Sequence, residues 1–253
     1  MTIISWDVGV KNLAFCIIDH ENHNKIEDWD IINLIEDITT DWKDILLFIA
    51  EKHKDIINEK INENIKNNIE IVPSVDLIFE AFNKFNFKDL KCIIVGMDPF
   101  VNKNEAMGLA FSINPSVIVK CPPSLRNIFK ELENEYKIKR TNTDLTDISL
   151  QGVLLLNTAL TTNLKKTGAH IKIWKGFIAD IFDYIANNKK NLTLMAWGNH
   201  AKSFSSIFNS NENLILEWTH PSPLSRKPFV GNNHFKLCND YLIKNKKKTI
   251  KWV

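Results

Sequence analysis

Four polar side chains in this sequence each follow a short apolar run: Asp98, Asn157, Asn199 and His220. A carboxylate, two amides and an imidazole are side chains that orient water, accept and donate hydrogen bonds, and stabilise charge during bond cleavage. If the chain brings them together, they form a site for a polar reaction on a small, flat substrate.

The stretch from Cys92 to Phe111, CIIVGMDPFVNKNEAMGLAF, sets Asp98 between two aromatic residues. Its first residues are rich in β-branched side chains and predict a buried strand, which Gly96 and an Asp-Pro turn then end. Phe100 follows the carboxylate directly and Phe111 follows a polar loop. A carboxylate between two rings suits a flat ring with chemistry at its rim, although Asp-Pro turns after strands are also common in proteins without such a site.

The elements that must position these groups alternate between strand and helix. Further strands are predicted over Val153–Leu156, Leu192–Trp197 and Leu214–Trp218. Helices are predicted over Asp41–Asn68, Val75–Phe82, the segment after an N-cap at Ser124, Ile173–Ala186 and Asn233–Asn245. This alternation predicts an α/β fold with a central, mainly parallel four-stranded sheet flanked by helices. Parallel strands end at one edge, where the four polar groups would meet.

Each polar group also has an ordinary structural interpretation. Asn157 could cap the next turn, and His220, before Pro221, could be a loop histidine with its hydrogen bonds satisfied. The lysine run at 246–248 could be a solvated tail or, alternatively, supply weak phosphate steering. The joint occurrence of four strand-end groups favours a site.

Residues 1–40 differ from residues 41–253, and we treat the two segments as separate units. Strands are predicted over Ile3–Trp6, Leu13–Asp19 and from Ile26 to about Ile32. The segment is therefore predicted to be a β-meander appendage, which needs another surface to pack on.

Composition excludes several classes of protein. The chain has 253 residues, 44% hydrophobic and 25% charged, with a net charge of +2, so an anionic partner must meet a local basic patch. Four cysteines lie far apart without a Cys-x-x-Cys pair, which predicts reduced thiols and no zinc site. The sequence has no run of membrane-spanning length, and its start, MTIISWD, does not resemble a signal peptide. These features predict an intracellular protein that does not insert into a membrane.

Several motifs occur in an order that resembles the family 1 uracil-DNA glycosylases. They are VGMDPF, MGLAFS, PPSLRNIFKEL, QGVLLLNTALT, LMAWGNHAKS, HPSPLS and GNNHF, and the resemblance runs from about Pro73 to Trp252. It implies an enzyme of base excision repair, with uracil-containing DNA, single- or double-stranded, as partner. Such an enzyme flips uracil out of DNA and hydrolyses the N-glycosidic bond without a metal or cofactor.

The resemblance also implies roles for single residues in catalysis and base binding. Asp98 matches the carboxylate that orients water and faces the sugar cation, and His220 the histidine that hydrogen-bonds uracil O2. Asn157 matches the amide that binds the uracil edge, and Phe111 the ring that stacks on the flipped base.

A further set of residues matches positions that grip DNA. Leu224 matches the wedge that enters the gap left in the duplex. The matches to the backbone-pinching loops are Pro122, Pro123, Ser124, Gly198 and Ser222. Arg226 and its neighbour Lys227 are candidates for additional phosphate contacts.

The sequence departs from the family's Gly-Gln-Asp-Pro-Tyr-His motif at three residues. Met97 replaces the glutamine, Phe100 the tyrosine and Val101 the histidine, and the RKPFVG loop is one residue short. The Phe100 ring can still fill the space of thymine's methyl group, and the backbone at Met97 can still bind the base. An alternative function is therefore a glycosylase-fold DNA-binding or replication-accessory module with weak or no activity.

The first strands suggest a separate, looser resemblance. SWDVGVKNLAFCIID resembles the start of RNase H-like Holliday-junction resolvases, in which Asp7 would match a metal-binding carboxylate. One carboxylate cannot hold a two-metal site, so a structural role, self-association or binding of a protein partner is expected for residues 1–40.

Overall fold

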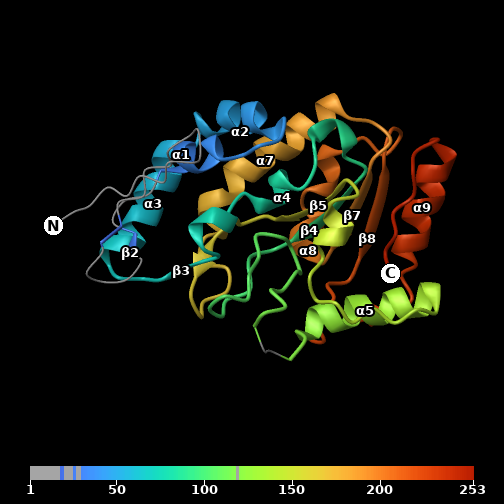
Figure 1. Cartoon of the computed structure of the whole chain (residues 1–253). Helices are drawn as coiled ribbons and strands as arrows, with labels where there is room; N and C mark the ends of the chain where they lie inside the picture. Colours follow the sequence, from blue (N-terminus) through green and yellow to red (C-terminus); the bar gives the residue numbers. More distant parts are fainter. Residues whose placement is uncertain (1–17, 20–24, 27–29, 118–119) are drawn as a thin grey trace.

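Four of the apolar runs form the central sheet in the computed structural model, which describes residues 18–19, 25–26, 30–117 and 120–253 (Figure 1). The strands are β4 (Cys92–Gly96), β5 (Val153–Asn157), β7 (Thr193–Trp197) and β8 (Leu214–Trp218). Their order is β5-β4-β7-β8, and all three pairings are parallel. β4, β5 and β7 are buried along their whole length, as expected of strands covered on both faces. The predicted α/β fold with a four-stranded parallel sheet is confirmed.

Helices cover the two faces of this sheet. On one side α7 (Ile171–Asn188) packs against α2 (Trp42–Ala50) and α3 (Lys54–Lys66), and on the other α5 (Pro123–Tyr136) packs against α9 (His234–Lys244) (Figure 1). The remaining elements are short: β1 (Ile18–Asp19), β2 (Lys25–Ile26), α1 (Ile31–Glu36), β3 (Ile71–Val72), η2 (Val75–Leu77), α4 (Glu80–Asn83), η3 (Phe87–Asp89), α6 (Thr146–Ser149), β6 (Thr162–Asn163), α8 (Asn199–Lys202) and η4 (Ser205–Ile207). No helix in the described part of the chain is long and apolar enough to span a bilayer.

The helix predicted over Asp41–Asn68 is instead two helices, α2 and α3, so this prediction was wrong. The chain turns at residues 51–53, where Lys52 and His53 donate to the carbonyls of Ile49 and Ala50. The turn lets His53 approach α7, where a Cβ on Gly176 would lie 2.8 Å from its ring. The Nε2 atom of His53 is 3.2 Å from the carboxylate of Asp180. Docking on α7 thus explains the break.

The predicted N-cap at Ser124 is also wrong. Helix α5 begins at Pro123, with Pro122 as the flanking residue, and Ser124 lies inside the first turn. Proline suits the first helical position because its fixed φ matches the helix and its missing N–H would have no partner there.

The N-terminal prediction holds only in part. β1 and β2 form an antiparallel pair, but the third predicted strand is wrong from Ile31 onward, where α1 begins. The Asp30 carboxylate accepts from the Ile32 N–H at 3.0 Å and starts this helix, whose Ile31, Leu34 and Ile35 are buried. Helix α1 packs against α2. The strand predicted at Ile3–Trp6 and the candidate Asp7 lie outside the described residues. The division at residue 40 and the partner of residues 1–40 stay predictions.

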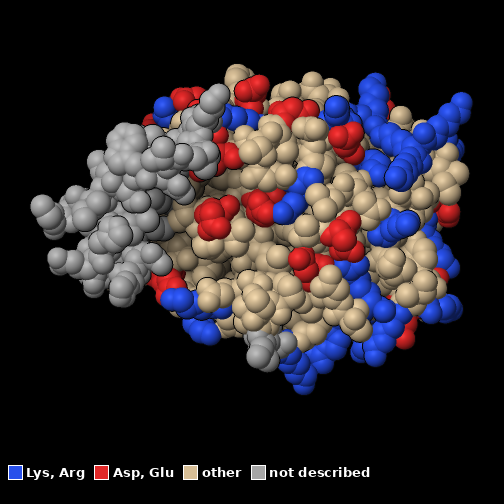
Figure 2. All heavy atoms as spheres, viewed as in Figure 1, with Lys and Arg blue, Asp and Glu red and all other residues tan. Residues whose placement is uncertain are grey.

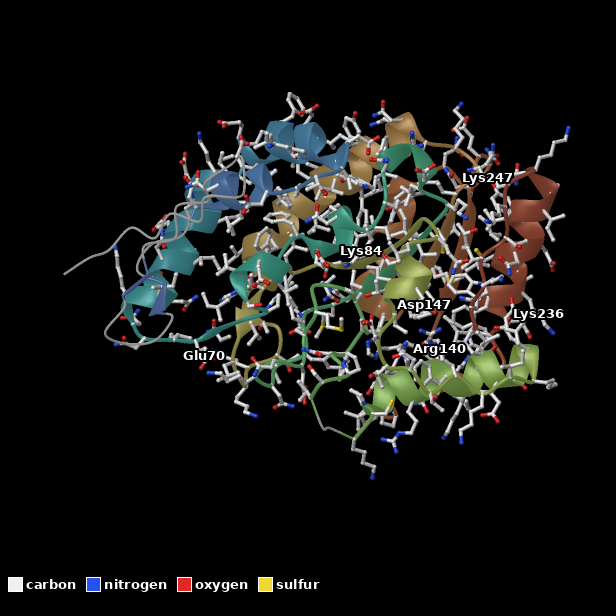
Figure 3. All side chains as sticks on the ribbon, in the orientation of Figure 1. Glu70, Lys84, Arg140, Asp147, Lys236 and Lys247 are labelled. Carbon is white, nitrogen blue, oxygen red and sulfur yellow. The ribbon has the colours of Figure 1, made fainter. Side chains whose placement is uncertain are left out.

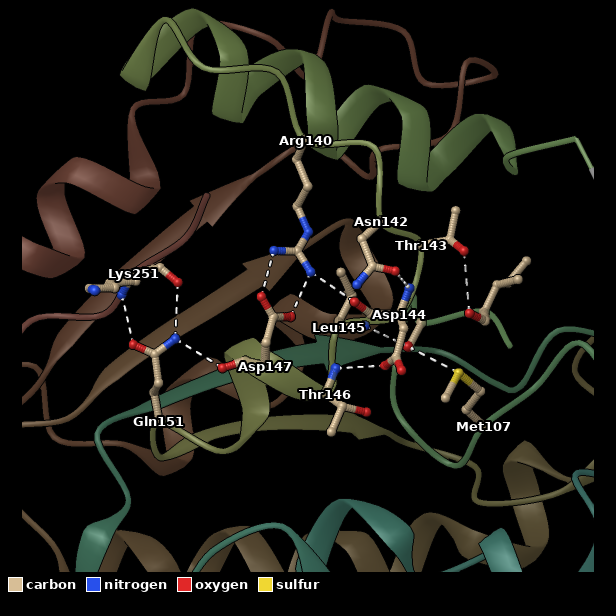
Figure 4. A network of polar contacts seen from close by, with 12 residues as sticks. Met107, Arg140, Asn142, Thr143, Asp144, Leu145, Thr146, Asp147, Gln151 and Lys251 are labelled. Atoms are coloured by element: carbon tan, nitrogen blue, oxygen red, sulfur yellow. Dashed lines mark hydrogen bonds and ion pairs between the residues drawn. The ribbon is translucent and has the colours of Figure 1, made fainter. Parts of the chain in front are cut away.

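Arg140 fixes the connection between α5 and β5 (Figure 4). Its guanidinium donates to both carboxylate oxygens of Asp147 at 2.9 and 2.6 Å and to the Asp144 carbonyl at 2.8 Å. Burial alone would raise the pKa of Asp147, but the hydrogen bonds and charge of Arg140 outweigh it and hold the pKa below its usual value. Gln151 pairs with the backbone of Lys251 and thereby ties the start of β5 to the C-terminal segment.

Two buried carboxylates of α5 hold the start of α9. Glu131 accepts from the N–H groups of Gly231 and Asn233 at 2.5 and 2.8 Å. Glu135 accepts from those of Phe235 and Lys236 at 3.3 and 2.6 Å. Burial and the neighbouring Glu131 raise the pKa of Glu135, while the two N–H groups lower it, and the net pKa is about 7.

The raised pKa of Glu135 predicts a pH-dependent stability. Between its ordinary pKa of 4.5 and about 7, the folded chain holds a proton that the unfolded chain has released. The free energy of unfolding should therefore fall as pH rises through this window and become level above it. Thermal melts of a Glu135→Gln variant should show a smaller slope between pH 5 and 7. Glu133→Gln, at an exposed position of the same helix, is the control, and an equal slope in all three proteins would contradict the assignment.

Candidate active site

Asp98 lies just beyond the carboxyl end of β4, in a half-buried position. Its Oδ2 atom accepts a hydrogen bond from the backbone N–H of Gly168 at 2.5 Å. Burial raises the pKa of this carboxyl, and the Gly168 N–H opposes that effect. The backbone of Gly168 has a φ of +74°, which favours glycine there. One carboxylate oxygen is thus fixed by the protein, whereas no hydrogen bond from a described residue reaches the other.

The amide of Asn157 packs against Gly96 on the neighbouring strand. The two residues are paired in the β4–β5 register, and a Cβ on Gly96 would lie 2.1 Å from the Asn157 Oδ1 atom. Only glycine leaves room for the amide at this point. Asn157 is 7% exposed, and no hydrogen bond joins its side chain to any other described residue. Its amide atoms are not fully enclosed, so water or a ligand can pair with them.

Phe111 is held in an unusual backbone conformation between two rings. Its φ is +64°, in the left-handed region that bulky residues rarely adopt. Its ring centroid lies 5.9 Å from that of Trp197 and 6.3 Å from that of His220. The preceding Ala110 donates to the Leu155 carbonyl at 2.9 Å, which anchors this turn on β5. Such strain persists only where the surroundings enforce it, and it is common at binding sites.

The protonation state of His220 follows from its neighbours. Its Nδ1 accepts from the Ser222 N–H at 3.0 Å, so the proton of a neutral ring is on Nε2. Burial lowers the pKa of this imidazole, which favours the neutral form. Gly198, whose φ is +89°, lies close behind the His220 side chain. A Cβ added to Gly198 would be 2.9 Å from the His220 Cβ. The ring therefore presents a neutral Nε2–H donor.

A chain of hydrogen bonds links the ends of three strands next to these groups. The carbonyl of Met97 accepts from the Ala159 N–H at 2.9 Å and from the Thr158 hydroxyl at 3.0 Å. The Thr158 hydroxyl has one proton, which it donates to Met97. It therefore accepts a hydrogen bond from Nε2 of His200, at 2.5 Å. Asn199, by contrast, is exposed at the start of α8 and does not share the buried setting of Asn157.

Leu224 is the most exposed large apolar side chain in the described part of the chain, at 93%. Its loop is held rigidly, since the Ser222 hydroxyl oxygen accepts from the Leu224 N–H and the Ser225 hydroxyl donates to the His220 carbonyl. Asn127 of α5 donates to the Pro221 carbonyl at 2.8 Å and ties the loop to the helix that begins with Pro123. Arg226 and Lys227, farther along the loop, are exposed, and no described carboxylate pairs with either.

The predicted site residues fall into two groups. Asp98, Asn157 and His220 lie at or just beyond the carboxyl ends of strands, and the Phe111 ring lies beside His220. The candidate DNA contacts lie on loops and, for Pro123 and Ser124, in the first turn of α5. Sequence reasoning missed the Gly168 N–H, the Thr158–His200 bond and the Asn127 tether. A lone glycine in the polar stretch KKTGAH gives no signal that its N–H will meet a carboxylate from another strand.

Comparisons with known proteins show the family of the chain. Residues 82–243 match the family model of the uracil DNA glycosylase superfamily. The uracil-DNA glycosylase of Borreliella burgdorferi is 43% identical over 218 residues, covering 84% of this chain and 97% of that protein. The Campylobacter jejuni enzyme of the same name is 42% identical over 219 residues, covering 85% and 94%. The crystal structure of mimivirus uracil-DNA glycosylase superposes with a TM-score of 0.78 at 27% identity, covering 83% of this chain and 85% of that one.

Proposed function

The chain belongs to the uracil DNA glycosylase superfamily and excises uracil from DNA, and we propose that Asp98, Asn157 and His220 carry out this hydrolysis. The proposal rests on three groups at the carboxyl edge of the sheet: a fixed carboxylate, a buried amide without a protein partner and a neutral imidazole N–H donor.

Asp98 and His220 act on opposite ends of the breaking bond. Cleavage of the N-glycosidic bond develops positive charge on the sugar and negative charge on the departing base. The Asp98 carboxylate faces the sugar cation and orients the attacking water, and the His220 Nε2–H donates to uracil O2. Both groups are held in place before the substrate arrives, which is where electrostatic catalysis gains most.

Asn157 and the aromatic residues select the base. The Asn157 amide accepts from uracil N3–H and donates to O4, whereas cytosine in the same position would leave mispaired polar groups. Phe111 stacks on the flipped ring, and Phe100 forms the wall against a thymine methyl group. Met97 stands where the family motif has a glutamine, and Val101 where it has a histidine. The missing amide and imidazole affect the affinity for DNA and the rate of uracil release. The Met97 carbonyl is already occupied by Thr158 and Ala159, which supports a structural use of that backbone.

Release of free uracil in the presence of EDTA tests the function directly. The full chain is incubated with a uracil-containing duplex, and free uracil and alkali-labile abasic sites are quantified. We expect multiple turnovers without metal. DNA retention without uracil release would instead support the alternative, a binding module on the same fold.

Leu224 is expected to matter more for duplex than for single-stranded DNA. Flipping a base from a duplex requires unstacking that costs a few kcal/mol, and a leucine inserted into the gap offsets part of it. Leu224→Ala should therefore slow release from the duplex more than from the single strand, measured under single-turnover conditions. Leu237→Ala, at an exposed position on α9, is the control.

Arg226 and Lys227 are proposed phosphate contacts in the same loop. Removing each charge should flatten the slope of log affinity against log salt by roughly 0.9 for duplex DNA. Binding isotherms for Arg226→Gln and Lys227→Gln at several salt concentrations measure this slope. An unchanged slope would mean that the side chain faces away from DNA.

A further inference from the structure

A surface pocket of about 510 Å³ lies at the opposite edge of the sheet from Asp98 and His220. Its lining includes five lysines, which we call the lysine pocket: Lys88, Lys91, Lys189, Lys247 and Lys248. In Figure 2 lysine and arginine side chains gather at the upper right of the molecule, where Figure 3 labels Lys247. The pocket sits where β4, β5 and β7 begin, and five-residue strands separate it from the active site by on the order of 16 Å.

Backbone carbonyls hold three of these ammonium groups in place. Lys91 Nζ donates to the Lys248 carbonyl at 3.3 Å, and Lys189 Nζ to the Lys88 carbonyl at 2.8 Å. Lys247 Nζ donates to the carbonyls of residues 190 and 191 at 3.2 and 2.8 Å. An ammonium has three N–H donors, so each of the three keeps at least one for a ligand. The lysines are thus positioned, in contrast to freely moving surface side chains.

The five lysines outnumber the nearby carboxylates, and the burial that lowers the pKa of Lys189 outweighs the opposing charges of Asp41 and Asp89. Asp89 is the one carboxylate among the lining residues, and no ion pair in the described part of the chain includes any of the five lysines. Burial lowers the pKa of Lys247, and the charges of Lys189 and Lys91 lower it further. Burial and Lys248 likewise lower the pKa of Lys91. Groups that repel one another in a half-buried pocket are stabilised when an anion binds between them.

We propose that the lysine pocket binds a compact oligophosphate, an anion with two or more linked phosphate groups. Several fixed ammonium groups around one recess match several linked phosphates better than a single small anion. The volume is that of a small-molecule site, and the apolar side chains of Phe85, Leu90 and Leu150 line the rest of it. The phosphates could belong to an inorganic chain or to a nucleoside triphosphate. A DNA backbone fits less well, because a continuous strand would have to enter a recess of small-molecule size.

Titration calorimetry with tripolyphosphate on the full chain tests the proposal. The pocket variant is Lys91→Met with Lys247→Met, and the control, with equal loss of charge, is Lys66→Met with Lys236→Met at exposed positions of α3 and α9. We expect the pocket variant to bind at least about tenfold more weakly, the scale of losing charge-assisted hydrogen bonds, and the control to bind like wild type. Uracil release should be unchanged in the pocket variant, which shows that it is folded. If it does not fold, Lys88→Gln with Lys248→Gln removes two exposed charges from the same pocket and should also weaken binding.

Proton uptake gives a second readout. A bound anion raises the lowered pKa values of the lysines, so binding at pH 9 should take up protons, seen as a dependence of the heat on the buffer's ionisation enthalpy. This uptake should be smaller in the pocket variant.

Further ligands separate the sources of phosphate. Tighter binding of ATP than of tripolyphosphate would assign the site to nucleotides, and equal or weaker binding would assign it to inorganic chains. Weaker binding of inorganic phosphate than of either supports the requirement for linked phosphates. No binding of tripolyphosphate at millimolar concentration in 150 mM salt would overturn the proposal. Equal binding of tripolyphosphate by the pocket variant and the wild type would also overturn it. The same holds if the pocket variant loses binding only to uracil-free single-stranded DNA.

Discussion

Replacing Asp98 with asparagine should lower the rate of uracil release at least ~100-fold, the scale of removing one preorganised electrostatic group. The substitution keeps the size of the side chain but removes the negative charge that faces the sugar cation. An asparagine could still accept from the Gly168 N–H through its carbonyl oxygen, so the local structure should persist. The loss is therefore expected in the chemical step and not in DNA binding.

Single-turnover kinetics and DNA-binding isotherms separate these two effects. Asp183→Asn makes the same chemical change at an exposed position of α7 and should behave like wild type. If Asp98→Asn released uracil at the wild-type rate, the catalytic carboxylate would have to be sought elsewhere.

Replacing His220 with leucine should also lower the rate at least ~100-fold, because it removes the donor to the departing base. His220→Gln should retain more activity, since a glutamine amide can still donate a hydrogen bond at this position. Because a glutamine oxygen could also accept from the Ser222 N–H, thermal melts of both variants separate a loss of stability from the loss of the donor. Equal rates in the two variants would count against the donor role.

The pH dependence adds a separate prediction for His220. A second proton on the ring must go to Nδ1 and break the bond from Ser222. Burial lowers the pKa of His220, which favours the neutral ring, and raises the pKa of Asp98, which shifts protonation of this carboxylate to higher pH than usual. Activity should fall on the acidic side, where Asp98 becomes protonated. That acidic limb should remain in His220→Leu, at a lower rate throughout.

Most of the sheet could be predicted because three of its four strands, β4, β5 and β7, are buried on both faces. Runs such as Cys92–Val95 and Val153–Leu156 are continuous and apolar, which is the pattern of parallel strands between helices. The parallel arrangement then placed Asp98, Asn157 and His220 at one edge before any contact was known.

Other features could not be predicted, because they depend on contacts distant in sequence. The break between α2 and α3 depends on His53 meeting α7, and Glu51 to His53 contain no helix-breaking residue. The cap of α9 comes from carboxylates on α5, although a sequence window around His234 contains none of them. Gly96 was identified as the end of a strand, yet its other role, leaving space for the Asn157 amide, needed the β4–β5 register.

The strand order β5-β4-β7-β8 also has a consequence for how activity appears during folding. Asp98 follows β4 and His220 follows β8, so the proposed catalytic pair exists only when strands from distant parts of the chain have joined. Contacts between residues far apart in sequence form late and slowly, because long loops must close first. During synthesis a nascent chain should be inactive until β8 has emerged from the ribosome. After dilution from urea, recovery of uracil release should lag behind the recovery of helical circular dichroism.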